Sequence, residues 1–160
     1  MIIAVREFLA LFDSPRETVA ERIRTLAEIL DKLACAYHEL PDQEAAYSSE
    51  APDDLASYND MRNAADRIFP EFGFYAVVPP EPNPDVQALM GDAIDDLADI
   101  ALEMKEVEWL WENSSLQDAE RHFRFGYQIH WGRHLHDLRS YIHAQQFESE
   151  STEPLRSRTE

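Results

Sequence analysis

The scarcity of chain breakers is the feature that most constrains how this chain can fold. Only four glycines occur in 160 residues, and five of the nine prolines fall between Pro70 and Pro84. Because helices tolerate glycine and proline least, the long stretches without either leave room for long helices. The composition, with 44% hydrophobic and 29% charged residues, is that of an ordinary globular protein. We therefore predict an all-α fold, an up-and-down helical bundle of four to five helices.

Five segments carry apolar residues at helical spacing. Several begin with a capping residue before a proline, as Ser14-Pro15 and Asn83-Pro84 do, and Ser115 to Asp118 has the form of a capping box. The predicted helices cover the opening dozen residues, Ser14 to Pro41, Pro52 to Pro70, Asn83 to about Trp111, and Leu116 to about Gln146. Residues 1–147 are predicted to form a single helical-bundle domain, and the polar residues 148–160 a disordered C-terminal tail.

The proline-rich segment from Pro70 to Pro84 interrupts this helical pattern. It contains several large apolar residues, among them Phe72, Phe74 and Tyr75. We predict an irregular, extended strap that lies across the bundle and buries its aromatic side chains, while the prolines fix its path.

The balance of charge bears on the partners this acidic protein can have. Thirty-two acidic residues against fourteen basic ones give a net charge of −18. Such a charge repels phosphate groups, so we expect no nucleic acid and no membrane surface as partner. Cys35 is the only cysteine, and no apolar run approaches the ~20 residues that a membrane span needs. The expected location is cytoplasmic.

The last two predicted helices face each other. The turn at Asn113-Ser114-Ser115 is short, so these helices are expected to lie antiparallel as neighbours. Counting outward from the turn places Asp99 level with His130, and Asp96 level with His134, to within about one helical turn.

Two histidines of the last helix are candidates for metal ligands. His130 and His134 are four residues apart on the predicted buried stripe, whereas His122, His136 and His143 are expected to point away from it. Carboxylates of the neighbouring helix would complete a site for iron, zinc or manganese. The candidate metal ligands are His130, His134, Asp96, Asp99 and Asp92. The Glu-x-x-His pattern of ferritin-like di-iron bundles is missing.

The same side chains fit an interpretation without metal. Buried histidines need hydrogen-bond partners, and aspartates on the next helix supply them. The acidic fourth helix also faces arginines of the fifth. A structural polar network that includes Asp95, Arg133 and Arg124 would then fix how these helices pair.

Two glycines lie inside the predicted last helix, where each costs about 1 kcal/mol relative to alanine. We expect close packing at Gly126 and Gly132, with a bend in the helix as the alternative. Trp109, Trp111 and Trp131 are predicted to anchor the core or an interface, and Phe125 to face away from the core.

Three short segments are similar to a known family. GFY at 73–75, GDAIDDLADI at 91–100 and HWGRH at 130–134 together resemble the bacterial family catalogued as domain of unknown function 5063. The resemblance spans the chain from the first helix to about His143. It implies an all-helical fold and no established activity, cofactor or partner. It also implies that Asp92, Asp95, Asp96, Asp99, His130, Trp131, Arg133 and His134 belong to one signature.

Two functions remain open from the sequence. The first is a non-enzymatic binding or interaction protein without a cofactor, acting as a homo-oligomer or with a protein partner. It rests on the absence of a recognisable catalytic motif, on the acidic surface and on outward-facing aromatic residues. The alternative is a metal-binding bundle or metal-dependent enzyme that uses His130 and His134, with a divalent metal ion as cofactor.

Overall fold

The computed structural model describes residues 1–13, 18–41, 50–52, 55–80 and 85–147. In these residues the chain forms six helices and one two-stranded sheet, which confirms the all-α helical bundle. The helices are α1 (Ile2–Leu9), α2 (Val19–Glu39), α3 (Tyr58–Ile68), α4 (Ala93–Asn113), α5 (Leu116–Ile129) and α6 (Trp131–Phe147); the strands are β1 (Phe74–Val77) and β2 (Leu89–Asp92). The predicted tail at 148–160 lies outside the described residues.

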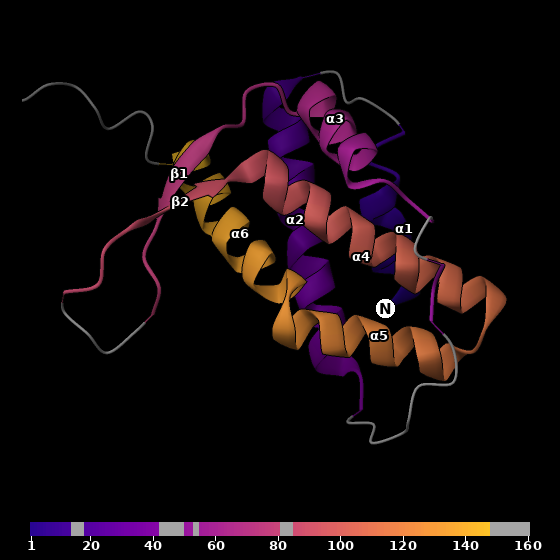
Figure 1. The fold of residues 1–160 in the computed structure, drawn as a ribbon. Coiled ribbons are helices and arrows are strands. Elements are labelled where there is room, and N and C mark those ends of the chain that lie inside the picture. The colour runs from indigo at the N-terminus through magenta and orange to yellow at the C-terminus, as the bar shows by residue number, and fades with distance from the viewer. Residues whose placement is uncertain (14–17, 42–49, 53–54, 81–84, 148–160) are drawn as a thin grey trace, which may run out of the picture.

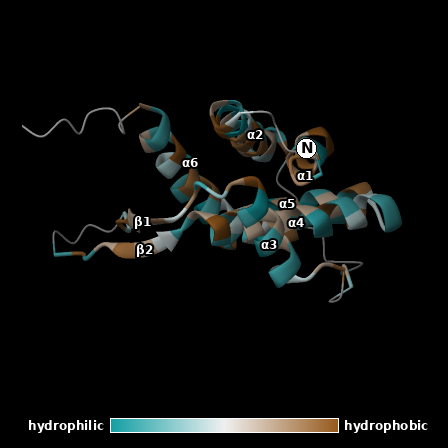
Figure 2. Ribbon diagram, turned by 90° about the horizontal axis from the view of Figure 1, so that it is seen from above, coloured by the Kyte–Doolittle hydropathy of each residue, from teal (hydrophilic) through white to brown (hydrophobic). Residues whose placement is uncertain are grey.

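Helix α4 is the centre of the bundle. It packs against α1, α3, α5 and α6, and Figure 1 shows it crossing the molecule with α3 on one side and α5 and α6 on the other. Its core-facing residues Leu97, Ile100 and Met104 are accordingly fully buried. Figure 2 shows hydrophobic and hydrophilic bands alternating along the helices, as expected where each helix turns one face inward. No helix among the described residues combines the length and apolar character needed to cross a bilayer.

Helix α2 begins later than its proline signal predicts. Ser14 to Glu17 lie outside the described residues, and the helix begins at Val19 with Thr18 as its N-cap. The Thr18 side chain accepts a hydrogen bond from the backbone N–H of Glu21 at 3.2 Å and donates one to its carboxylate at 2.9 Å. These contacts resemble a capping box, at a position four residues after the predicted one. Helix α3 likewise begins at Tyr58, after Ser57, and not at Pro52.

The predicted strap is extended, as expected, but the prediction that it is irregular was wrong. Strand β1 pairs antiparallel with β2, so that Tyr75 lies opposite Gly91 and Phe74 opposite Asp92. An extended backbone needs hydrogen-bond partners, and β2 supplies them, while the prolines of this segment lie outside the strand. The predicted burial of aromatics holds for Phe72 but not for Phe74, which is 68% exposed.

The predicted start of the fourth helix was also wrong. Residues Leu89–Asp92 are strand β2, and α4 begins at Ala93. Asp92 is its N-cap, with a side chain that accepts from the backbone N–H of Ile94 at 3.0 Å. Met90, which belongs to this strand, is 76% exposed.

The predicted fifth helix is in fact two helices. Helix α5 ends at Ile129, and His130 leaves the helical region with φ −142° and ψ −89°. At the break Trp131 folds back into the core, where it is fully buried and its Nε1 donates to the carbonyl of Phe123 at 3.2 Å. Burial of this indole offsets the cost of interrupting the helix at His130.

Close packing at both glycines is confirmed. A Cβ at Gly132 would lie 2.2 Å from the backbone oxygen of Tyr127, and one at Gly126 would lie 2.8 Å from Cδ1 of Trp131. The helix breaks between these two close approaches, so the alternative of a bend is realised as well.

Candidate metal centre between α4, α5 and α6

A row of carboxylates on α4 meets a row of histidines on α5 and α6. The three closest pairs are Glu106 with His122, Glu103 with His130, and Asp96 with His134. As the residue number falls along α4 it rises along α5 and α6, which confirms the predicted antiparallel arrangement. The predicted level of Asp96 with His134 is confirmed too.

His134 uses both ring nitrogens in this row. Its Nδ1 lies 2.7 Å from Oδ1 of the buried Asp96, and its Nε2 lies 3.5 Å from Oδ2 of Asp99. The other oxygen of Asp96 accepts a hydrogen bond from the Tyr75 hydroxyl of β1. The bond to Asp96 raises the pKa of His134 above its ordinary value, against the opposing effect of burial. Asp96 therefore fixes the ring and leaves Nε2 directed toward Asp99.

His130 was predicted to face the core, and this was wrong. As the C-cap of α5 it lies outside the helix, and its side chain is 43% exposed. Its Nδ1 contacts Oε1 of Glu103 at 2.8 Å. The rings of His130 and His134 nevertheless stay close, with centroids 5.1 Å apart and planes at 83°. One ligating atom each from Asp99, His130 and His134 lie within 4.8 Å of one another.

His122 was predicted to point away from the core, and this was also wrong. Its Nε2 lies 3.0 Å from Oε2 of Glu106 and 3.2 Å from Oε2 of Glu103. Once the helix breaks at His130, the face of α5 toward α4 is set by its own small buried residues, Ala119 and Gly126. His122 is three residues after the first and four before the second, so it shares their face.

The charges in this row shift one another's pKa values. Burial alone would lower the pKa of His122, but Glu103 and Glu106 outweigh it and raise the pKa to about 9. Burial would raise the pKa of Glu103, but His122 and His130 lower it below the ordinary value. Burial raises the pKa of Asp99, and His134 opposes this rise.

Gly126 makes room for Glu103. A Cβ at position 126 would lie 2.6 Å from Oε2 of Glu103. Oε2 of Glu103 and Nε2 of His122 are both buried from water, and neither makes a hydrogen bond of regular geometry although they are 3.2 Å apart. Nε2 of His122 therefore lies near two carboxylate oxygens, Oε2 of Glu103 and Oε2 of Glu106.

The other predicted residues lie elsewhere. Asp92 pairs with Arg62 of α3 at 2.6 Å, and Asp95 accepts from Arg62 and from Tyr58, so the hydrogen bonds of both run to α3. Both also line the cavity that His134 borders. Arg62 was not foreseen, because nothing in the sequence placed α3 beside the start of α4.

The two arginines of the predicted network have different partners. Arg133 lies 3.5 Å from Asp137 within α6. Arg124 donates to the carbonyl of Leu40 at 2.7 Å and lies over the ring of Tyr37. Of the residues expected to form one network, Arg124 lies apart, whereas Asp95 and Arg133 line one cavity together with His134.

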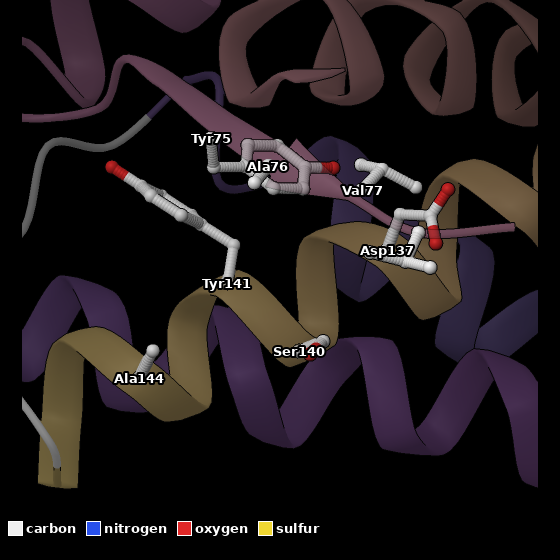
Figure 3. A pocket seen from close by; sticks show the side chains of 8 residues that line it. Tyr75, Ala76, Val77, Asp137, Ser140, Tyr141 and Ala144 are labelled. Carbon is white, nitrogen blue, oxygen red and sulfur yellow. The ribbon is translucent and has the colours of Figure 1, made fainter. Parts of the chain in front are cut away.

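Two cavities border Tyr75, and one of them reaches the pair of Asp96 and His134. One of about 210 Å³ is lined by residues of the sheet, α4 and α6, including Asp96 and His134 themselves. The other, of about 460 Å³, lies between β1 and α6. Figure 3 shows it, with Tyr75 beside Tyr141, whose ring it stacks on at 4.9 Å between centroids. Tyr75 lines both cavities, so the hydroxyl that holds Asp96 borders open space.

Comparisons with known proteins find a similar fold but give no information about the site. No protein-family model matches the chain, and no curated protein matches it. A similar solved structure is the crystal structure of protein BF1032 from Bacteroides fragilis, a structural genomics target. It aligns with a TM-score of 0.69 at 18% sequence identity, over 91% of this chain and 89% of that one. At this identity the likeness shows a shared fold alone.

Proposed function

We propose that this protein binds a divalent metal ion through Asp99, His130 and His134. The observation that carries the proposal is the convergence of these residues, whose ligating atoms lie within 4.8 Å of one another. Metal-binding histidines commonly hold their second nitrogen on a carboxylate, and both histidines do so here, His134 on Asp96 and His130 on Glu103. Asp96 is thus an orienting residue in this proposal.

The distances fit a small divalent ion. Ligands about 2.0–2.2 Å from a tetrahedral ion lie about 3.5 Å from one another. Nε2 of His134 and Oδ2 of Asp99 are 3.5 Å apart. Two imidazoles and a carboxylate suit zinc, iron or manganese.

The chemistry of such a centre follows from its open side. Three protein ligands leave room for water or a substrate in the remaining positions. The cavity of about 210 Å³ that reaches His134 and the exposure of His130 provide access from solvent. Metal-assisted hydrolysis or oxidation are the reactions that this ligand set would support.

Metal analysis and zinc titration test the proposal. Protein purified without added metal is examined by elemental analysis, stripped with a chelator, and titrated with Zn²⁺ by calorimetry. We expect binding that His134→Gln or Asp99→Asn weakens by at least about tenfold, since each removes a ligand. His143→Gln, which changes an exposed histidine at the far end of α6, is the matched control. Affinities equal to wild type in both ligand variants would refute the site.

A role in protein interaction is a second proposal, with a different observation behind it. Phe125 and Ile129 are four residues apart on α5 and are 48% and 66% exposed. Neighbouring exposed apolar residues are typical of contact surfaces. We propose self-association or a protein partner at this face, and expect Ile129→Glu to lower the mass measured by light scattering. A wild-type protein with the mass of a monomer would refute self-association.

We propose three further properties from the sequence. They are a cytoplasmic location, the absence of nucleic-acid and membrane partners, and membership of the bacterial family of unknown function whose short motifs the chain resembles. The net charge of −18 supports the exclusion of anionic partners.

A further inference from the structure

We infer a second cation position one helical turn along α4, formed by Glu103, Glu106 and His122, so that the seam between α4 and α5–α6 binds two ions. The inference rests on the proposed function in one respect, because Glu103 also holds His130 of the first position. None of the three residues belongs to the ligand set predicted from the sequence.

The three residues converge as ligands do. Nε2 of His122 lies 3.0 Å from Oε2 of Glu106 and 3.2 Å from Oε2 of Glu103, and the ligating atoms of all three lie within 4.8 Å of one another. These separations approach the roughly 3.5 Å expected between ligands that share one tetrahedral ion. Two carboxylates facing one imidazole also leave a negative charge that a divalent cation would balance.

An ordinary ion pair explains this geometry less well. Nε2 of His122 and Oε2 of Glu103 are buried from water, yet neither has a hydrogen bond of regular geometry. Buried polar atoms without such a partner are uncommon and call for a physical reason. An ion lying between the nitrogen and the two oxygens would satisfy all three atoms at once.

Glu103 joins the two positions. Its Oε1 contacts Nδ1 of His130, a ligand of the first ion, while Oε2 faces the second position. Asp99 and Glu103 are one turn apart on α4, a rise of roughly 6 Å. Gly126 permits this arrangement, because a Cβ there would lie 2.6 Å from Oε2 of Glu103. An ion at the second position would therefore hold Glu103 in the orientation that His130 needs.

The stoichiometry of Zn²⁺ binding tests the inference. Chelator-stripped protein is titrated with Zn²⁺ by calorimetry, and bound ions are counted by native mass spectrometry. We expect two ions per chain in the wild type and one in His122→Gln and in Glu106→Gln. His143→Gln and Glu112→Gln, which change exposed residues away from the row, should keep two. Circular dichroism checks that each variant is folded. If His122→Gln does not fold, Glu106→Gln alone tests the second position.

The possible outcomes separate this inference from the proposed function. One ion in the wild type that His134→Gln abolishes and Glu106→Gln leaves in place would overturn the second position and leave the first. One ion lost in Glu106→Gln but retained in His134→Gln would overturn the first position and support the second. Absence of bound zinc in the wild type would overturn both.

Electron paramagnetic resonance tests whether the two ions lie close together. With Mn²⁺ in place of zinc, two ions this close should give a spin-coupled electron paramagnetic resonance spectrum. Glu106→Gln should restore the signal of an isolated ion. An isolated-ion spectrum in a wild type that carries two Mn²⁺ ions would contradict the shared Glu103.

Discussion

Two pairs of glutamates on helix α4 meet basic side chains of neighbouring helices, and the two contacts differ in the basic partner. Toward α1, Glu108 and Glu112 pair with Arg6 at 3.1 Å and 2.7 Å, and the Arg6 side chain is 47% exposed. Toward α5, Glu103 and Glu106 pair with His122, whose side chain is 22% exposed. We call the first contact the arginine seam. The second contact, together with the neighbouring pairs Glu103–His130 and Asp96–His134, is the histidine seam.

The difference shows how one helix can carry structural and chemically competent carboxylates together. A guanidinium stays protonated and offers no lone pair, so the arginine seam is an exposed ion pair and nothing more. An imidazole can lose its proton and become a metal ligand. Shielding from water strengthens its electrostatic coupling to the glutamates. The partner supplied by the neighbouring helix therefore decides what α4 can do.

The largest expected effect comes from the break between α5 and α6, the two helices that carry the histidines. Gly132→Ala places a Cβ 2.2 Å from the Tyr127 carbonyl oxygen, so the backbone at the break must move. We expect a loss of about 2–3 kcal/mol, because the strain exceeds the helix-propensity gain of about 1 kcal/mol. Urea unfolding measures it. Gly73→Ala, with no atom within 4 Å of the added Cβ, is the control and should change stability little. Equal stabilities of the two variants would refute the close approach.

Zinc should stabilise through the histidine seam and not through the arginine seam. Free zinc at a hundred times the dissociation constant adds about 2.7 kcal/mol for one site, if the unfolded chain does not bind it. We expect this increase in the unfolding free energy of the wild type and of Arg6→Gln, and a smaller one in His134→Gln. The same increase in all three proteins would mean that zinc binds elsewhere.

The pH dependence of stability should come from the histidine seam. The pKa of His122 in the folded chain is about 9, above its unfolded value of about 6.5, so its contribution is complete below the unfolded value. It is lost as the pH rises through about 9. We expect the metal-free protein to lose roughly 2 kcal/mol between about pH 7 and pH 10, a figure reduced for partial exposure. The raised pKa of His134 acts in the same direction.

Unfolding of His122→Gln across the same pH range isolates this contribution. The variant should be less stable than the wild type near neutral pH, and its stability should change less on alkalinisation. A wild-type stability that stays flat up to about pH 10 would contradict the raised pKa of His122.

The smallest expected effect belongs to the arginine seam. Arg6→Ala removes an exposed pair of ion contacts, and we expect a loss below about 1 kcal/mol that salt reduces further. A double-mutant cycle with Glu108→Ala measures the coupling. A coupling larger than that between His122 and Glu106 would reverse the comparison.

The sequence by itself determined the parts of this protein that depend on neighbours along the chain. Helical periodicity predicted α1, α2 and most of α4. The capping box at Ser115 is confirmed by the hydrogen bond that the backbone N–H of Asp118 donates to the Ser115 hydroxyl at 3.1 Å. The short turn before it predicted the antiparallel pairing. That pairing was enough to place Asp96 against His134, because helix geometry fixes which residues lie level once two helices are neighbours.

Only the tertiary structure decided the rest. Pairing of β1 with β2 converted Leu89–Asp92 from predicted helix to strand, since backbone hydrogen bonds came from a distant segment. Burial of Trp131 accompanies the break of the last helix at His130, and α5 packs on α4 with the face that carries His122. A local pattern states which conformation a segment favours alone. Where two distant segments both gain by meeting, the energy of their contact outweighs that preference, and it is there that the second set of candidate ligands arose.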